Sequence, residues 1–193
     1  PGWPKRGQQE FLASRLWPHS AYGKNAIYKV GHHGNAILSK HAFVDWENIN
    51  VSFMKKASRS LLHGVIDLQD HSIKLHVICV HLGLFEFERR RQLAVLVERI
   101  EKHVPHDESL IIAGDFNDWR INADKYFKQL LGVVEVYKTS HGRYAKTFPA
   151  WLPVLSMDRI YSRGLTIDSC DVLSASVWRH LSDHLPIEAC FNI

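Results

Sequence analysis

Cysteine is scarce in this chain, and long apolar runs are absent. Cys79, Cys170 and Cys190 are the three cysteines in 193 residues, and none belongs to a Cys-x-x-Cys pair. An odd count without such pairs argues against a disulfide framework or a zinc cluster, and predicts buried, reduced thiols in a cytoplasmic protein. No apolar run approaches the roughly 20 residues of a membrane-spanning helix. The N-terminal "PGWPKRGQQEF" lacks an apolar core, so we expect neither a membrane span nor a signal peptide.

Low-complexity tracts, internal repeats and Gly/Ser-rich linkers are also missing. We therefore expect residues 1–193 to form a single domain. The hydrophobic content of 46% and charged content of 23% are ordinary for a globular protein. A net charge of +4 favours an anionic partner only weakly.

What the chain does contain is a pattern of many strands and few helices. Helical spacing predicts helices at 8–17, 86–104 and 122–131. Strands are expected at 25–30, 35–39, 49–55, 59–68, 73–82, 109–114, 133–138, 157–162, 166–175 and 186–192. Because strands and helices do not strictly alternate, the pattern predicts an α/β sandwich with mixed sheets.

The stretch "IIAGDFNDW" at 111–119 places oxygen-bearing side chains at the end of a predicted buried strand. Asp115, Asn117 and Asp118 all lie within four positions. In layered α/β domains, ligands bind at the carboxyl ends of strands. An Asx turn, in which Asp or Asn bonds the backbone just ahead, explains the same letters. This stretch alone therefore leaves a turn and a functional site both open.

Three further predicted strand ends carry similar side chains. His81 ends the strand in "HVICVHLG", Asp158 opens "MDRIY", and Asp183 and His184 precede the last strand in "SDHLPIEACF". Each has a plain alternative: a solvated histidine, an ion pair of Asp158 with Arg159, and turn chemistry. Four such coincidences are rarer together than one alone, so we expect these side chains to share a site.

In this order and spacing, "HL", "GDFN", "MDRIY" and "SDHLP" resemble the motifs of the endonuclease/exonuclease/phosphatase superfamily. "GHHGNAILSK" at 31–40 resembles the early hairpin of that family. The resemblance extends from about residue 22 to residue 190, and is greatest to small bacterial members of unassigned substrate. It implies a four-layer α-β-β-α sandwich of two mixed sheets, the DNase I-like fold, and a phosphoesterase activity.

One feature of that family has no counterpart in this sequence. Family members carry a metal-binding Glu where an early strand ends in Gln-Glu. "GQQEF" at 7–11 offers Glu10, but no apolar strand precedes it. An acidic residue in the first turn of a helix is explained by the helix dipole. We therefore expect a family member that lacks the first strands of the fold, with an exposed sheet edge where they would pack.

The resemblance also implies roles for individual side chains. Asp115 would orient or deprotonate the attacking water, and Asn117 would bond a phosphate oxygen. His184 would donate to the phosphate as an imidazolium, with Asp183 or another carboxylate holding its tautomer. His81 would contact the phosphate or assist the leaving oxygen as a general acid.

Metal binding follows from the same resemblance and from the ligand types. Asp115, Asn117 and Asp183 are the candidate ligands, and their oxygens suit Mg²⁺ or Mn²⁺. Asp158 would orient a histidine or share in metal binding. An EF-hand calcium loop is excluded, because "DFND" is followed by no Gly at the sixth position and by Tyr126 at the twelfth.

Asn35 and His33 lie in a glycine-flanked turn that the resemblance places at the rim of the site, as substrate-binding residues. A hairpin turn that needs Gly31 and Gly34 for backbone freedom explains these letters equally well.

Two charged positions receive structural interpretations. We expect Asp118 to cap a turn rather than to bind metal. Arg89, Arg90 and Arg91 are interspersed with glutamates, which predicts a solvated helical face instead of a nucleic-acid surface.

These expectations leave two functions open. The first is a Mg²⁺-dependent phosphodiesterase that attacks phosphorus with water, on a nucleic acid, a phospholipid head group or a small phosphodiester. The second is a catalytically weak or inactive phosphate-binding module of the same fold, because the N-terminal Glu ligand is absent. The dispersed aromatic residues form no stacking platform for nucleic acid. Neither the ester nor the oligomeric state is specified by the sequence.

Overall fold

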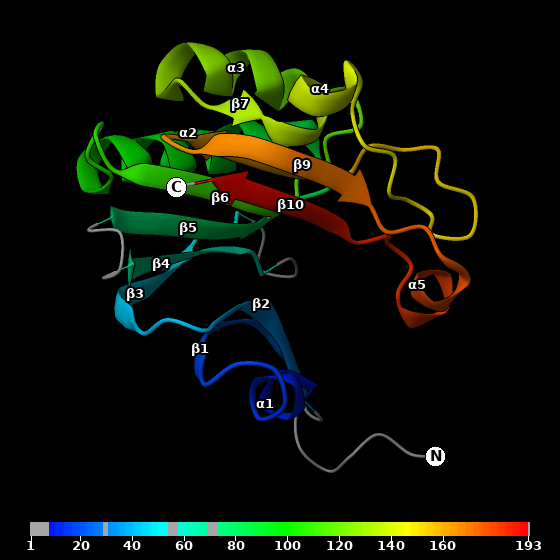
Figure 1. Ribbon diagram of the computed structural model, residues 1–193, viewed down its shortest axis with the longest axis horizontal. Helices are drawn as coiled ribbons and strands as arrows, with labels where there is room; N and C mark the ends of the chain where they lie inside the picture. Colours follow the sequence, from blue (N-terminus) through cyan, green and yellow to red (C-terminus); the bar gives the residue numbers. More distant parts are fainter. Residues whose placement is uncertain (1–7, 29–30, 54–57, 69–72, 193) are drawn as a thin grey trace.

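The computed structural model describes residues 8–28, 31–53, 58–68 and 73–192. A six-stranded mixed sheet with the order β3-β4-β5-β6-β8-β7 forms its centre (Figure 1). Its strands are β3 (Phe43–Asn50), β4 (Ser60–Leu68), β5 (Ile73–His81), β6 (Ser109–Asp115), β7 (Val134–Glu135) and β8 (Asp158–Arg163). β5 and β6 are parallel, whereas the other neighbouring strands are antiparallel.

Helices cover one face of this sheet. α2 (Glu86–His103) and α3 (Asn122–Leu131) pack there, and Figure 1 shows α2 behind the sheet. The buried stripe of α2 includes Leu93, Leu96 and Ile100, which join Ile78 and Ile112 of the sheet in the main core. Full burial of one such side chain stabilises the fold by about 1.5–3 kcal/mol. The apolar spacing of α2 thus fixes which face of the sheet is covered by helices.

The other face carries two hairpins. β1 (His19–Tyr28) pairs with β2 (Gly31–Ser39), and β9 (Thr166–Val172) pairs with β10 (Ile187–Asn192). Among the described residues, each hairpin is a separate two-stranded antiparallel sheet. Ala113 and Ile160 on this face of the central sheet are only half-buried. The second sheet of the expected sandwich is therefore present as two separate hairpins.

Several predicted element boundaries were wrong. The strand expected at 49–55 is β3, which lies at Phe43–Asn50. Of the strand expected at 133–138, only β7 (Val134–Glu135) is a strand, and the second half is the start of the helix α4 (Val136–His141). Glu135 is the N-cap of α4: its side-chain carboxylate accepts a hydrogen bond from the backbone amide of Lys138 at 2.5 Å. The first helix, α1 (Gln8–Ala13), is shorter than predicted, and α5 (Ser176–Leu181) was missed. β1 begins before the strand expected at 25–30, whose last two positions lie outside the described residues.

Two burial predictions also need correction. Cys170 is buried as predicted, but Cys79 is half-buried and Cys190 is exposed, because alternate residues of β10 face outward. Arg89 is buried rather than solvated: its guanidinium donates to the carbonyl oxygens of Gly83 and Leu84, at 3.2 and 2.5 Å. Within the described part of the chain, no helix combines the length and the apolarity that crossing a membrane requires.

Candidate active site

Three polar side chains lie in one row across the central sheet. β5 ends at His81, β6 ends at Asp115, and β8 begins at Asp158. The strand register pairs His81 with Asp115, and Asp115 with Asp158. His81 Nε2 lies 3.6 Å from Asp115 Oδ2. The structure therefore brings together three of the strand-end residues that the sequence singled out.

His184 joins this row through Asp158. The distance from His184 Nδ1 to Asp158 Oδ2 is 2.7 Å, and the Thr147 hydroxyl donates to the same oxygen at 2.6 Å. The Phe148 ring lies 4.8 Å from the His184 ring, centroid to centroid. Of the two alternatives that the sequence left open, Asp158 rather than Asp183 holds the imidazole.

Asp183 lies apart from these contacts. Its side chain is exposed, and Oδ1 is 3.4 Å from the Ser182 hydroxyl. Its backbone carbonyl accepts a hydrogen bond from the Ala150 amide at 2.7 Å, which fastens the segment before β10 to the neighbouring loop. The geometry thus gives Asp183 a place in the loop, and not in the row of strand ends.

The turn formed by "GDFN" orients the carboxylate of Asp115. The Asn117 amide donates to Asp115 Oδ1 at 2.8 Å, and Asn117 Nδ2 donates to Asp115 Oδ2 at 3.1 Å. Asn117 Nδ2 also donates to the Leu82 carbonyl at 3.0 Å. Asn117 has a φ of 50°, a left-handed conformation that Asn tolerates. The turn and the candidate site are therefore the same structure, in which the turn orients Asp115.

Asp118 has a structural position, as expected. Its Oδ2 accepts hydrogen bonds from the Ala123 amide at 2.9 Å and from Arg159 Nη1 at 3.3 Å. Both side chains of the Asp118–Arg159 pair are almost fully buried. The sequence alternative that paired Arg159 with Asp158 is wrong, because adjacent residues of β8 point to opposite faces.

Burial and neighbouring charges separate the pKa values of these groups. Burial raises the pKa of Asp115 to about 6, and the Asp158 carboxylate adds to this shift. Burial lowers the pKa of His81 to about 4, with a further contribution from the charge of Arg59. The hydrogen bond with Asp158 raises the pKa of His184. At neutral pH, Asp115 is therefore ionised, His81 is neutral, and His184 is the histidine that holds a proton more readily.

Sequence reasoning missed Arg59. This half-buried guanidinium donates from Nε to the Leu82 carbonyl at 3.2 Å, and its charge acts on both His81 and Asp115. Arg59 comes directly before β4, which is antiparallel to β5 and so begins at the edge where β5 ends. This antiparallel pairing, which the strand pattern of the sequence does not specify, places the cation beside His81.

The glycine-flanked turn at the start of β2 is part of the β1–β2 hairpin. Asn35 is buried and its Nδ2 donates to the carbonyls of Ser60 and Cys79, at 2.8 and 3.3 Å, which fastens β2 to the central sheet. His33 is exposed, and its charge acts on His81. A Cβ at Gly34 would lie 2.1 Å from the Gly23 carbonyl oxygen, so the hairpin requires glycine there.

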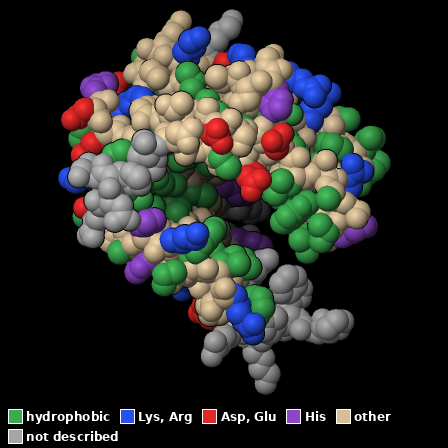
Figure 2. Space-filling view, in the orientation of Figure 1, with side chains coloured by type: hydrophobic (Ala, Val, Ile, Leu, Met, Phe, Trp, Pro, Cys, Tyr) green, Lys and Arg blue, Asp and Glu red, His purple; other side chains and the backbone are tan. Residues whose placement is uncertain are grey.

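A cavity of about 350 Å³ leads to the row of strand ends. It lies between β6 and β8 on one side and the start of β10 on the other, and both Asp158 and His184 line it. Figure 2 shows the molecule hollowed between its main body and the lower hairpin, with histidine side chains visible inside the hollow. Asp158 and His184 are thus open to a ligand in this cavity.

The expected metal site is not complete in the described residues. Among them, no three side chains of His, Cys, Asp or Glu converge as a metal ion would require. Asp115 is a suitable hard ligand, but the group of Asn117 that faces it is the amide nitrogen, and Asp183 is on an exposed loop.

Comparison with known proteins identifies the family. Residues 3–184 match the model of the Endonuclease/Exonuclease/phosphatase family. The chain belongs to this family. It is 43% identical to YbhP of Escherichia coli over 187 residues, which cover 97% of the chain and 74% of YbhP. It is 31% identical to a UPF0294 protein of Yersinia pseudotuberculosis over 140 residues, or 68% of the chain and 48% of that relative.

Solved structures of this family share the fold. D. rerio TDP2, humanized by 14 mutations, matches with a TM-score of 0.76 at 24% identity, covering 95% of the chain and 80% of TDP2. The mannosyl-6-phosphatase of Bacteroides thetaiotaomicron matches with a TM-score of 0.72 at 17% identity, covering 96% and 81%. These matches confirm the predicted DNase I-like fold.

Proposed function

We propose that this chain hydrolyses a phosphodiester by attack of water at phosphorus. The observation that carries the proposal is the meeting of Asp115 with the His184–Asp158 pair at one edge of the sheet. A carboxylate that is ionised near pH 6 suits a general base, and a histidine held by a carboxylate suits a proton donor. Family members are hydrolases, including the phosphatase among the structural neighbours, which supports this class of reaction.

Asp115 is the proposed base. Its carboxylate accepts a proton from the attacking water as the water oxygen forms its bond to phosphorus. The two hydrogen bonds from Asn117 hold the carboxylate in place, so little reorganisation is needed at that moment. A base with a pKa near the working pH combines an ionised ground state with useful basicity.

His184 is the proposed donor to the phosphate and to the leaving oxygen. As the bond from phosphorus to the leaving oxygen breaks, the imidazolium gives that oxygen a proton and stays hydrogen-bonded to Asp158. Arg59 would stabilise the negative charge that develops on the phosphate oxygens. His81 would contact the phosphate as a neutral imidazole. The general-acid role expected for it is disfavoured, because its pKa is lowered to about 4.

The proposed substrate is a nucleic acid, a phospholipid head group or a small phosphodiester. The solved complex of D. rerio TDP2 with a single-strand DNA product supports the first of these.

Mg²⁺ or Mn²⁺ is the proposed cofactor. It would neutralise phosphate charge, with Asp115 as the described carboxylate suited to hold it. Three unpaired cysteines support a cytoplasmic location.

Hydrolysis of bis-p-nitrophenyl phosphate, with and without Mg²⁺, tests the proposal. We expect the Asp115→Ala variant to lose about 10²–10⁴-fold in rate, as a general base contributes. Asp107→Ala, which removes an exposed carboxylate elsewhere, is the matched control and should keep the wild-type rate. Equal turnover by Asp115→Ala and the wild-type protein would show that the site is assigned wrongly.

A second candidate is a phosphate-binding module with weak or no catalysis. The incomplete metal site among the described residues favours it. Calorimetric titration with Mg²⁺ separates the two candidates: this one predicts weak binding, and micromolar affinity would count against it. A coding sequence upstream of Pro1 that specifies a strand ending in Gln-Glu would also favour the enzyme.

A further inference from the structure

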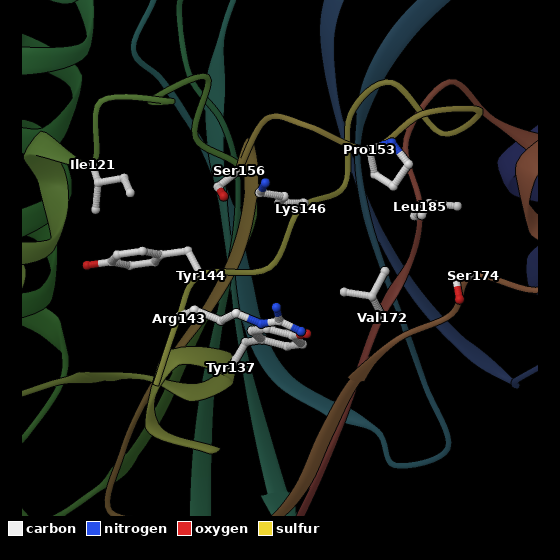
Figure 3. Close-up of a pocket in the computed structure, with 10 residues that line it drawn as sticks. All are labelled: Ile121, Tyr137, Arg143, Tyr144, Lys146, Pro153, Ser156, Val172, Ser174 and Leu185. Carbon is white, nitrogen blue, oxygen red and sulfur yellow. The ribbon is translucent and has the colours of Figure 1, made fainter. Parts of the chain in front are cut away.

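A second cavity, of about 440 Å³, lies beside the candidate active site (Figure 3). Its walls come from α4, the loops at 142–147 and 153–156, the end of β9, and Leu185 just before β10. In Figure 3, Ile121 and Tyr144 lie on one side, Leu185 and Ser174 on the other, and Lys146 between them. A volume of this size accommodates a small organic ligand.

The charge of this cavity is positive. Arg143 and Lys146 both line it, and neither forms a hydrogen bond or ion pair with any residue that the structure describes. None of the lining side chains is acidic. Both side chains are exposed, and two cations without a carboxylate partner at one cavity favour an anionic ligand, because a phosphate can form charge-assisted hydrogen bonds with them.

Aromatic rings form fixed parts of the same wall. The Tyr144 hydroxyl donates to Asp124 Oδ2 at 2.7 Å and accepts from Lys138 Nζ at 2.8 Å. The Tyr137 ring stacks on His141, with a centroid distance of 4.2 Å. Both rings are therefore held in place by contacts outside the cavity, while the cations remain available. Apolar lining side chains such as Ile121, Val172 and Leu185 suit the apolar part of a ligand.

The chain connects this cavity closely to the candidate active site. Lys146 precedes Thr147, which bonds Asp158, and Leu185 follows His184 directly. Adjacent Cα atoms are about 3.8 Å apart. Leu185 lines both this cavity and the one that contains Asp158 and His184. A ligand in this cavity would therefore lie close to the cavity that contains Asp158 and His184.

We propose that the Arg143–Lys146 cavity is a binding subsite for a phosphorylated ring, such as a nucleoside monophosphate unit, on the part of the substrate that does not react. The two cations bind its phosphate, and the tyrosine and apolar walls bind its ring. This inference rests on the proposed function, since it assigns a second anionic group to the substrate of the same enzyme.

Calorimetric titration with adenosine 5′-monophosphate tests the subsite directly. We expect saturable 1:1 binding to the wild-type chain, and about tenfold weaker binding to the double variant Arg143→Ala/Lys146→Ala. Lys40→Ala/Lys128→Ala removes the same charge from exposed positions elsewhere, and should bind like the wild type. Adenosine and inorganic phosphate, each lacking one half of the probe, should both bind more weakly than the monophosphate.

Two further results decide between this inference and its alternatives. His184→Ala should retain binding of the monophosphate, whereas loss of binding in that variant alone would place the ligand in the catalytic cavity and overturn the subsite. Equal affinity of the wild-type and the Arg143/Lys146 variant, or no saturable binding, would also overturn it. The proposed function is tested separately: Asp115→Ala should lose hydrolysis of bis-p-nitrophenyl phosphate and still bind adenosine 5′-monophosphate, so a failure of the catalytic assignment and a failure of the subsite give different results.

Discussion

Gly114 shows how a single residue sets the geometry of the catalytic edge. Its φ is 140°, and a Cβ at this position would lie 2.0 Å from the Val80 carbonyl oxygen. The strands β5 and β6 approach so closely here that only glycine fits. This approach places Asp115, the next residue, beside His81. The glycine of the "GDFN" motif is therefore required by packing as well as by backbone conformation.

Replacing Gly114 with alanine tests this requirement. We expect Gly114→Ala to lower the free energy of unfolding by more than about 3 kcal/mol, because it adds a clash to the strain of positive φ. Gly132→Ala is the matched control: its φ is 64° and no atom lies within 4 Å of the added Cβ. For that variant, the free energy of unfolding should fall by about 1–2 kcal/mol. Urea denaturation measures both, and equal losses would contradict the packing argument.

Asp118 is a second residue whose role is structural. Its carboxylate accepts a hydrogen bond from the Ala123 amide in the first turn of α3 and pairs with the buried guanidinium of Arg159. We expect Asp118→Ala to cost about 3–5 kcal/mol in the free energy of unfolding, because it leaves Arg159 buried without a partner. Asp107→Ala, at an exposed position, should change it by less than about 0.5 kcal/mol. A loss from Asp118→Ala as small as that of the control would refute the structural assignment.

At the scale of elements, a buried histidine chain links β4, β5 and α2. Arg99 Nε of α2 donates to His63 Nδ1 at 3.1 Å, and His63 Nε2 lies 2.9 Å from His76 Nδ1. His76 Nε2 lies 2.5 Å from Glu108 Oε2, just before β6. Since His63 Nδ1 is an acceptor, its Nε2 carries the proton that bonds His76. His63 is therefore neutral in the fold, where its hydrogen bonds link α2, β4 and β5.

This chain predicts a specific dependence of stability on pH. Burial, followed by the charge of Arg99, lowers the pKa of His63 to about 3 in the fold, against about 6.5 when unfolded. As pH falls below about 6.5, the unfolded state binds a proton that the fold does not, so stability is lost. When the pH is lowered from 7 to 5, the free energy of unfolding of His63→Gln should therefore fall by about 2 kcal/mol less than that of the wild type.

The matched control for that experiment is His106→Gln, at an exposed position. It should show the pH dependence of the wild-type protein in urea denaturation at the two pH values. If His63→Gln shows the same pH dependence as the wild type, then His63 is not kept unprotonated in the fold, and the prediction is wrong.

At the scale of the whole molecule, the strand ends meet because the central sheet places them in register. The sequence was sufficient to predict this, since apolar runs located β5, β6 and β8 and polar residues marked their ends. It was also sufficient to predict the mixed α/β class. The two separate hairpins on the second face leave β2 and β10 each with one strand neighbour among the described residues.

Other features could not be predicted, because they depend on contacts between distant segments. Arg59 reaches the site only through the antiparallel pairing of β4 with β5. The choice of Asp158 over Asp183 as partner of His184 depends on where the last loop folds back. The low pKa of His81 reflects burial, which a histidine at a strand end does not reveal. Arg89 looked solvated because only the folded loop supplies the carbonyls that it binds.

The most direct test of the account is a double-mutant cycle on Asp158 and His184, read as kcat/KM for bis-p-nitrophenyl phosphate. If the two side chains act as one unit, Asp158→Asn and His184→Ala should each lower kcat/KM by about 10²–10⁴-fold. The double variant should then be no slower than the slower single variant. Losses that multiply in the double variant, or a wild-type rate in either single variant, would contradict the account.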